Sequence, residues 1–353
     1  MIDEIYYKVV DLLKKMISTP SVSRDEAEVA EVVERFLKDE GLKVERFGNN
    51  LYVAPVASDP SLPTLLLNSH IDTVRPVEGW VRDPFAPVEE DGRLYGLGSN
   101  DAGASVVSLI AAFILLSQHP QPYNLALLLS CEEEVSGKGG ISSVIDKIGK
   151  IDFAVVGEPT GMRPAVAEKG LMVLDGEIDG EAGHAARNEG VNAIYKAIDV
   201  VDTLRDLRFD KESRMLGPVK ISVTQINAGT QHNVVPDLCS IVVDVRTTDA
   251  YSNIETLELI RAAVPQCRLT PRSTRLNPSG VSSDHPLVCR ASMLGLEPFG
   301  SPTLSDQALM PWPSLKMGPG DSARSHTADE YILLDEIRQA IEYCLRILDG
   351  LEL

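Results

Sequence analysis

Four short apolar runs of strand length each lead into a histidine or an acidic residue. They are TLLLNSH (64–70), LALLLSCEEE (125–134), FAVVGEPT (153–160) and SLKMGPGDSARSH (314–326). Helical patterns such as SVVSLIAAFILLS (105–117) and LLDEIRQAIEYCLRIL (333–348) lie between or after them. Continuous apolar strands that alternate with helices are typical of an α/β fold with a mostly parallel sheet covered on both faces. Ligands bind at the carboxyl ends of strands in such sheets, which is where these polar residues fall.

The first 40 or so residues show apolar positions at helical spacing. The segment STPSVSRDE (18–26) interrupts this pattern, and its Ser and Asp residues are good N-caps for a helix that starts in AEVAEVVERFLKDEGL (27–42). Gly41 is expected to mark the end of that helix.

Between about residues 166 and 275 the pattern changes to half-buried strands. The strands LMVLDGEIDG, KISVTQINAG, LCSIVVDVRTT and CRLTPRS alternate with the helical stretches NAIYKAIDVVDTLRDL and IETLELIRAAV in the order βαββαβ. This order predicts a compact α+β sandwich inserted into the first domain. We therefore expect a catalytic domain formed by residues 1–165 and 276–353, and an inserted domain at 166–275.

Composition excludes several classes of function. The 353 residues carry a net charge of −19, which argues against nucleic acid and anionic membranes as partners. The acidic start shows no export signal, and the longest apolar stretch is too short to span a bilayer, so a cytoplasmic enzyme is expected. The five cysteines are scattered and include no CxxC pair, which argues against a disulfide scaffold or a thiolate zinc site.

Five candidate metal ligands stand at the strand ends or in their loops: His70, Asp101, Glu134, Glu158 and His326. Two imidazoles and three carboxylates suit zinc, cobalt or manganese. With one bridging carboxylate, this is the ligand count of a two-metal hydrolytic site with ions roughly 3.5–4 Å apart. An HxD pair alone is more often structural, and an acidic CEEE run alone is more often a solvated loop. The coincidence of all five at neighbouring strand ends favours the metal site.

At these residues the chain resembles the acetylornithine deacetylase and succinyl-diaminopimelate desuccinylase family of co-catalytic metallohydrolases. The resemblance spans nearly the whole chain, through SHIDTV, GRLYGLGSNDAGAS, EEEVSGKGG, VGEPT and GPGDSARSHTADEYI. It implies two divalent metal ions, with Zn²⁺ expected and Co²⁺ or Mn²⁺ as alternatives. The implied ligands are Asp101 as the bridge, His70 and Glu158 for one ion, and Glu134 and His326 for the other.

The resemblance also implies roles for the neighbouring residues. Asp72 would accept the second imidazole proton of His70 and fix its tautomer. Glu133 would be the general base that takes a proton from the attacking water and delivers it to the departing amine. The peptide bond between Asp101 and Ala102 is cis in this family.

The inserted segment resembles the family in KGLMVLDGEIDGEAGHAARNEGVNAI and TQINAGTQHNVVPDLCSIVVDVR. The resemblance implies that His184 reaches the active site of a partner subunit, so that a homodimer forms through the inserted domain. Asn233 and Arg246 would bind the substrate, and Arg246 could hold an α-carboxylate through a two-pronged contact. Further substrate contacts are expected from the glycines of GPG and from the LSDQ segment, namely Gly318, Gly320, Ser305 and Asp306.

We therefore expect a metal-dependent hydrolase that removes an acyl group from the α-nitrogen of an amino acid. Details such as VGEPT and PTLSDQALMPWPSLKMGPG resemble the acetylornithine deacetylase branch, which belongs to arginine biosynthesis. The acyl group is acetyl or succinyl, and alternative substrates are N-succinyl-diaminopimelate, acetyl-lysine, acetyl-citrulline and short peptides. A metal-binding regulatory protein and a calcium-binding protein are the non-enzymatic alternatives. The first predicts missing ligands and the second predicts oxygen ligands only, whereas His70 and His326 are present.

Overall fold

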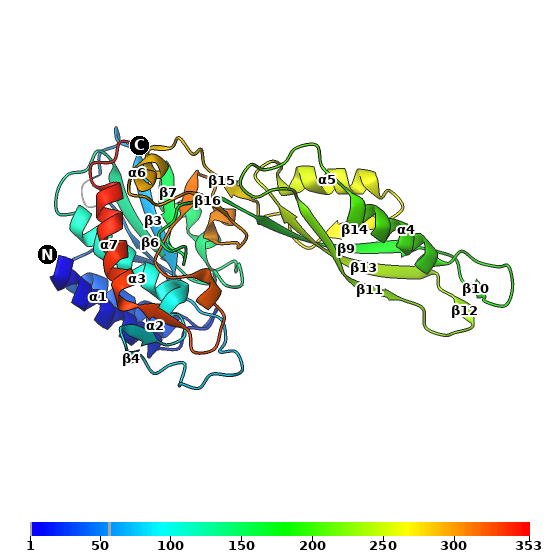
Figure 1. Cartoon of the computed structure of the whole chain (residues 1–353), viewed down its shortest axis with the longest axis horizontal. Helices are drawn as coiled ribbons and strands as arrows, with labels where there is room; N and C mark the ends of the chain where they lie inside the picture. The colour runs from blue at the N-terminus through cyan, green and yellow to red at the C-terminus, as the bar shows by residue number, and fades with distance from the viewer. Residues whose placement is uncertain (1, 56–57) are drawn as a thin grey trace. The chain divides into compact units, whose positions relative to one another are not determined.

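The chain forms two compact units in a computed structural model that describes residues 2–55 and 58–353. Unit 1 comprises Met1–Val166, Gly280–Phe299 and Ser305–Leu353, and unit 2 comprises Ala167–Ser279 and Gly300–Leu304. The expected insertion at 166–275 overlaps unit 2, which also takes up the short return segment 300–304. Figure 1 shows the colour of the chain change from one unit to the other and back.

The four apolar runs form the adjacent strands at the centre of the sheet in unit 1. These strands are β6 (Asn124–Ser130), β3 (Thr64–His70), β7 (Phe153–Val156) and β17 (Ser314–Lys316), in this spatial order. All three pairings between them are parallel, so their carboxyl ends lie at one edge. Antiparallel pairing adds β2 (Asn50–Val53) and β1 (Val44–Phe47) beyond β6. On the other side the sheet continues through β8 (Ala165–Glu168), with β15 (Ser279–Gly280) and β16 (Phe299–Ser301) beside β8.

Alternate residues of the central strands enter two different hydrophobic cores. Leu65 and Leu67 join the larger core, to which all α-helices of unit 1 contribute. These helices are α1 (Ile2–Ile17), α2 (Ala27–Asp39), α3 (Ala104–Leu116), α6 (Pro286–Met293) and α7 (Leu334–Leu348). Leu66 joins the smaller core with Leu128 and Ile141, which short turns such as Ile141–Ser143 cover. The sheet is thus covered on both faces, as an apolar run without alternation requires.

Helix α3 is apolar on all sides because it lies inside unit 1. The segment Ser99–Leu116 is long and apolar enough to cross a membrane by length and composition, but 89% of it is buried in the protein. In Figure 1, α3 lies beside α1 and α7. Its composition is therefore that of a core helix.

The start of α2 differs from the expectation. The N-cap residue is Glu26, and its side chain makes no capping hydrogen bond, so the prediction of a Ser or Asp cap was wrong. The carboxylate of Glu26 instead accepts hydrogen bonds from the backbone N–H groups of Arg24 and Glu132. Gly41 adopts the left-handed conformation with φ +82° just after the helix, as predicted.

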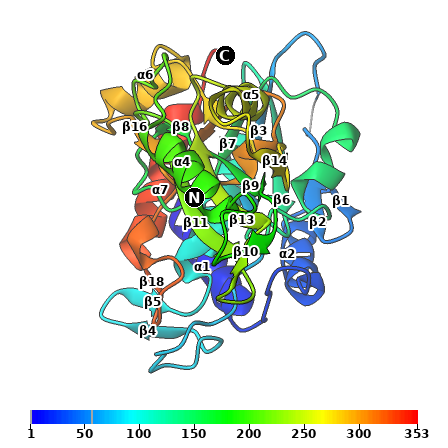
Figure 2. The same ribbon diagram turned by 90° about the vertical axis from the view of Figure 1, so that its right-hand side faces the viewer.

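A small three-stranded sheet joins two distant parts of unit 1. Its strands are β4 (Val88–Glu90), β5 (Arg93–Tyr95) and β18 (Tyr331–Leu333), and Figure 2 shows them together. The backbone N–H of Gly96 donates to the carbonyl of Glu330 at 3.0 Å. This sheet therefore places Glu330 next to the segment that leads to Asp101.

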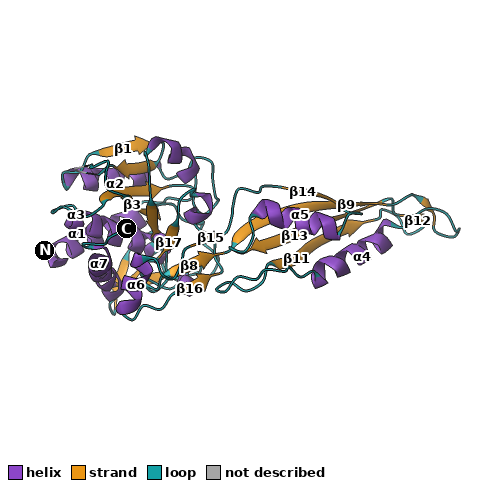
Figure 3. Ribbon diagram, turned by 90° about the horizontal axis from the view of Figure 1, so that it is seen from above, coloured by secondary structure: helices purple, strands orange, loops and turns teal. Residues whose placement is uncertain are grey.

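Unit 2 is an antiparallel sheet with two helices, in the predicted order βαββαβ. Its strands are β9 (Gly170–Asp179), β11 (Lys220–Ala228), β13 (Leu238–Thr247) and β14 (Arg268–Pro271), in the spatial order β11-β13-β9-β14. Helices α4 (Ala193–Asp206) and α5 (Asn253–Ala263) share one hydrophobic core with this sheet, and Figure 3 shows them alongside its strands. A separate two-stranded antiparallel sheet of β10 (Gly183–His184) and β12 (Val234–Val235) also belongs to the unit.

Candidate metal centre

The structure brings the five candidate ligands together at the carboxyl edge of the central sheet. His70 is the last residue of β3, Glu134 and Glu158 follow β6 and β7, and His326 follows β17. Asp101 lies in the turn Ser99–Gly103 that precedes α3. Their ligand atoms form two groups, one of His70, Asp101 and Glu158 and one of Asp101, Glu134 and His326. Within each group these atoms lie within 4.8 Å of one another, and Asp101 belongs to both.

The two carboxylate oxygens of Asp101 face different histidines. Oδ1 lies 3.2 Å from Nε2 of His70, and Oδ2 lies 3.7 Å from Nε2 of His326. Each imidazole also has a second carboxylate: Glu158 Oε1 lies 3.6 Å from His70 Nε2, and Glu134 Oε2 lies 3.0 Å from His326 Nε2. This arrangement is the one that a carboxylate bridging two metal ions requires.

Backbone contacts fix the segment that carries Asp101. The buried carboxylate of Glu330 accepts hydrogen bonds from the N–H groups of Asn100 at 2.8 Å and Asp101 at 3.0 Å. Gly98 has φ +76°, and a Cβ there would lie 2.6 Å from the Thr73 side chain, so a larger residue cannot fit. The peptide bond between Asp101 and Ala102 is cis, as the resemblance implied.

The loop after β6 carries Glu133 and Glu134, and two buried carboxylates hold its backbone. Glu26 accepts a hydrogen bond from the N–H of Glu132 at 3.2 Å. Asp72 accepts from the N–H of Glu133 at 3.0 Å and from that of Glu134 at 3.2 Å. Three consecutive N–H groups are thus bound by side chains that lie outside the loop. Glu132 itself has φ +54°, an unfavourable conformation for a residue with a Cβ, which these contacts stabilise.

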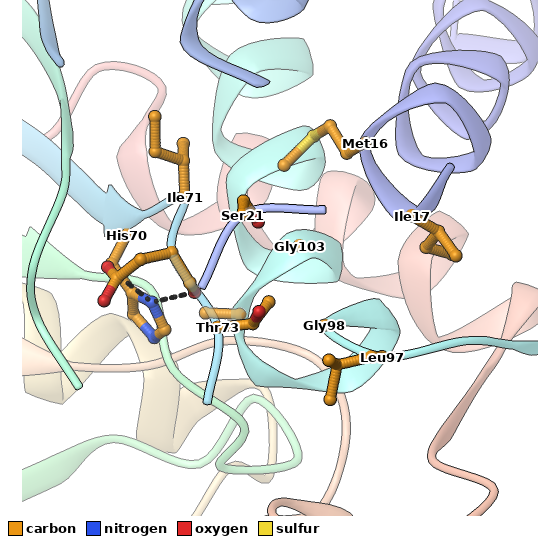
Figure 4. Close-up of a pocket in the computed structure, with 11 residues that line it drawn as sticks. Met16, Ile17, Ser21, His70, Ile71, Thr73, Leu97, Gly98 and Gly103 are labelled. Carbon is orange, nitrogen blue, oxygen red and sulfur yellow. Dashed lines mark hydrogen bonds and ion pairs between the residues drawn. The ribbon is translucent and has the colours of Figure 1, made fainter. Parts of the chain in front are cut away.

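Asp72 orients His70, although its closer contact is through the backbone. His70 Nδ1 lies 3.0 Å from the carbonyl oxygen of Asp72 and 3.5 Å from its carboxylate. Nδ1–H therefore donates to the carbonyl, which leaves Nε2 facing Asp101. Figure 4 shows His70 and Thr73 beside a narrow pocket that Met16 and Ile17 of α1 line from the other side.

The carboxylates of the centre are largely buried and lie close to one another. Burial raises the pKa of Glu158 to about 8 and raises the pKa of Glu133 well above its usual value. The hydrogen bond to Glu134 raises the pKa of His326 to about 9. Burial opposes a charge on His70, but the hydrogen bonds to Asp101 and Asp72 outweigh it and raise the pKa of His70. The centre therefore favours additional positive charge.

The donor set fits two divalent cations of the zinc type. It offers imidazole nitrogens and carboxylate oxygens and no thiolate, which suits Zn²⁺, Co²⁺ or Mn²⁺. Oε1 of Glu158 is buried and receives no hydrogen bond from any described residue. A buried acceptor without a donor is unfavourable unless a cation compensates it. None of the five cysteines forms a disulfide.

Glu133 lies beside the two ligand groups without belonging to either. Its Oε2 is 4.0 Å from His70 Nε2. A carboxylate that lies beside the ligand groups without belonging to them can exchange a proton with a group bound at the centre.

The expected substrate residues of unit 2 lie in two places. His184 in β10 pairs with Val234, and the N–H of Ala185 donates to the carbonyl of Asn233 at 3.0 Å, so His184 and Asn233 are neighbours. Arg246 lies opposite Leu171 near the far end of β13. Nearly the whole length of β13 therefore separates Arg246 from the other two residues. The guanidinium of Arg246 also holds Asp244, with Nε at 2.9 Å from Oδ1.

The glycines of GPG and the LSDQ residues are internal. Gly318 packs against the backbone of Glu158, and the carbonyl of Gly320 accepts a hydrogen bond from the N–H of Gly161 at 2.7 Å. The two glycines therefore position the loop after β7, which carries the candidate ligand Glu158. Ser305 and Asp306 are 2% and 3% exposed, and Asp306 Oδ2 accepts from the hydroxyl of Ser130 at 2.5 Å. The structure shows these four residues in contacts that support the loops around the ligand groups, and their expected role in binding the substrate stays a prediction.

Sequence reasoning missed Glu26 and Glu330. Each is an acidic residue in a chain with many of them, and each lies in a segment that looked like a loop or a helix start. The only sequence signal is position, because Glu26 follows SVSRD and Glu330 immediately precedes the apolar strand YIL.

Known proteins share both the sequence pattern and the fold. The model of peptidase family M20/M25/M40 matches residues 66–350. An acetylornithine deacetylase from Proteus mirabilis is 29% identical over 92% of this chain and 91% of its own length. A succinyl-diaminopimelate desuccinylase from Wolbachia pipientis of Culex pipiens is 30% identical over 70% of this chain and 66% of its own length.

Solved structures share the fold at lower identity. Aminopeptidase PepT from Bacillus cereus has a TM-score of 0.80 at 19% identity, covering 98% of both chains. The Bacillus subtilis YXEP protein, described as a dinuclear metal binding peptidase of the M20 family, has a TM-score of 0.74 at 16% identity, covering 98% of both chains. The expected fold class and the expected class of metal-dependent amidohydrolase are both confirmed by these matches. The chain belongs to the M20/M25/M40 family of peptidases.

Proposed function

We propose that this protein hydrolyses the amide bond of an Nα-acyl amino acid at a dinuclear metal centre, with N-acetylornithine as the expected substrate. The observation that carries the proposal is the position of Asp101, whose two oxygens face His70 and His326. His70 and Glu158 would complete one metal site, and Glu134 and His326 the other. The presence of every ligand and of Glu133 argues against a metal-binding regulatory protein on this fold.

Two cations held there would act as Lewis acids on a water molecule and on the scissile carbonyl. Glu133 would accept a proton from the attacking water at its carboxylate. It would then deliver this proton to the nitrogen of the departing amine, so that a carboxylate and a free amine result. Glu26 and Asp72 support this transfer because they hold the backbone of Glu132, Glu133 and Glu134.

The proposed substrate is supported by the relatives that match most of the chain. The acetylornithine deacetylase from Proteus mirabilis aligns over 92% of this chain, which supports N-acetylornithine and, with the same pocket chemistry, N-succinylornithine. The second candidate is N-succinyl-diaminopimelate, supported by desuccinylases of about the same identity over shorter alignments. Arg246 would hold the α-carboxylate of either substrate through its guanidinium.

The proposed function includes a homodimer formed through unit 2. His184 and Asn233 lie at one end of the sheet of unit 2 and Arg246 at the other, so one copy of this unit cannot direct all three to one small substrate. Strand β11 forms an open edge of this sheet within the described chain. Apolar side chains gather on β11 and on the adjoining start of α4, where Tyr195 is 70%, Ile198 50% and Ile226 52% exposed. An open strand edge with exposed apolar residues is suited to a second copy of the chain.

A free-amine release assay on the zinc-loaded protein tests the proposal. The substrates are acetyl- and succinyl-ornithine, succinyl-diaminopimelate, acetyl-lysine, acetyl-citrulline and several dipeptides. We expect the highest kcat/KM for acetylornithine. Hydrolysis of dipeptides alone would overturn the deacylase assignment, and a preference for succinyl-diaminopimelate would replace the substrate with the second candidate.

A further inference from the structure

A second pocket lies entirely within unit 2, away from the ligand groups along the chain. Its volume is about 270 Å³, and it lies where the end of α4 meets the turn before β11. Leu204 and Arg208 contribute from the end of α4, Val219 and Lys220 from the start of β11, and Lys169 from the junction of β8 and β9. Pockets that bind small organic molecules begin at roughly 300 Å³, so this one has room for a compact ligand.

The charged side chains around this pocket are all basic. Lys169, Arg205, Arg208 and Lys220 line it, and no acidic residue does. Among the described residues, no carboxylate lies within 4.0 Å of the charged groups of Lys169, Arg208 and Lys220, whereas Arg205 pairs with Asp202 and Asp206. Other arginines of the same unit are neutralised, since Arg268 pairs with Glu177 and Arg272 with Asp175. Lys169, Arg208 and Lys220 thus form no ion pair with a described residue in a chain of net charge −19, although Asp206 lies near enough to Arg208 for electrostatic interaction.

One of these cations is held in a fixed position. Nη1 of Arg208 donates to the carbonyl oxygens of Leu207 at 2.9 Å and Arg205 at 3.3 Å. These bonds restrain the guanidinium at the pocket and leave its Nη2 group available. A restrained guanidinium loses less conformational freedom when it binds a carboxylate than a mobile one does.

The remaining wall of the pocket is apolar. Leu204 and Val219 are buried, and Leu207, Leu216 and Ile221 are half-buried. A ligand in this pocket can therefore contact both apolar side chains and basic side chains.

We propose that this pocket binds a small organic carboxylate whose apolar body lies on Leu204 and Val219. The carboxylate group would contact Arg208 and the two ammonium groups of Lys169 and Lys220. An inorganic anion would lose the apolar contacts, and a neutral alcohol would lose the ionic ones, so both are expected to bind more weakly than the carboxylate. All residues that line the pocket belong to unit 2 and all five candidate ligands to unit 1, and the proposal does not depend on which substrate the centre takes.

Methyl NMR of the full-length protein, titrated with hexanoate, tests the proposal. We expect saturable shifts at the methyl groups of Leu204, Val219 and Ile221, and weaker binding of hexanol and of inorganic phosphate. The triple variant Lys169→Gln, Arg208→Gln and Lys220→Gln should bind hexanoate at least about tenfold more weakly. The control Arg187→Gln, Arg268→Gln and Arg272→Gln removes the same charge from exposed positions of unit 2 and should bind as the parent does.

Unchanged methyl spectra of unit 1 and an unchanged Tm establish that both triple variants fold. The proposal is overturned if hexanoate causes no saturable shift at these methyl groups. It is also overturned if both triple variants lose affinity equally, or if phosphate binds as tightly as hexanoate, because the pocket would then respond to charge alone.

Discussion

The Glu26 carboxylate accepts a hydrogen bond from the backbone N–H of Glu132 at 3.2 Å, although the two residues lie far apart in the sequence. The same carboxylate accepts from the N–H of Arg24 and, at 3.1 Å, from the side-chain amide of Asn49. Glu26 is 1% exposed, so its buried carboxylate depends on these three donors. The contact links the start of α2 to the loop that carries Glu133 and Glu134. It therefore helps to fix the position of the loop backbone.

Replacement of Glu26 should therefore impair catalysis from outside the centre. Glu26→Ala leaves three partly buried donors without their acceptor, which costs about 1–3 kcal/mol in the free energy of unfolding. We expect kcat to fall more than KM rises, because the proton acceptor Glu133 is displaced while the substrate contacts of unit 2 remain. Steady-state kinetics and chemical denaturation measure both effects.

Glu28→Ala is the matched control, because Glu28 lies exposed on the first turn of α2 and contacts no part of the loop. If the kcat of Glu26→Ala equals that of the control, the hypothesis that Glu26 positions the loop is contradicted.

Replacement of Glu133 should separate chemistry from metal binding. Glu133 belongs to neither ligand group, so Glu133→Gln is expected to keep its metal content. Its kcat should fall by about 10²- to 10⁴-fold, because the amide cannot accept the proton of the attacking water. Metal analysis and kcat on the same preparation test this, with Glu133→Asp as a variant that keeps the carboxylate. Loss of metal together with activity would show instead that Glu133 is a ligand.

His184 should act on a substrate held by the other copy of the chain. His184→Ala is expected to lower kcat without loss of metal, since the residue lies in unit 2 and outside both ligand groups. Mixing His184→Ala with Glu133→Gln should restore part of the activity, because some dimers then contain one intact site. His232→Ala is the control, as His232 is also exposed in unit 2 and has no expected role. Activity that stays at the level of the separate variants would argue against sharing between subunits.

Charge on the exposed apolar surface of α4 should prevent dimer formation. Tyr195 and Ile198 are exposed on this helix, and in a monomer their replacement disturbs no core contact. Sedimentation velocity should show a dimer for the parent and a monomer for Tyr195→Asp with Ile198→Asp. A parent protein that sediments as a monomer at micromolar concentration would contradict the proposed assembly.

The sequence predicted the central strands and the convergence of the candidate ligands because one physical pattern carries both. Continuous apolar runs such as LLL at 65–67 must be buried on both faces, and parallel neighbours must end at the same edge, so His70 and Glu158 had to lie near each other. The end of α2 at Gly41 followed from an equally local signal, a glycine just after the last apolar position of the helix.

The supporting contacts could not be predicted, because they depend on tertiary structure. Glu26 and Glu330 resemble solvated acidic residues until folding buries them against backbone N–H groups. Asp306 in LSDQ is likewise buried, and its carboxylate accepts a hydrogen bond from the hydroxyl of Ser130, which is far away in the sequence. Local patterns report which face of a strand is apolar, and they do not report which distant loop an acidic side chain will hold.

The central claim, a dinuclear site bridged by Asp101, is tested most directly by counting metal ions. Elemental analysis after dialysis should find two divalent ions per chain in the parent protein and in the exposed-site control Asp146→Ala. Asp101→Ala should retain neither ion, because its two oxygens serve both ligand groups. An Asp101→Ala protein that keeps the full metal content of the parent would contradict the account.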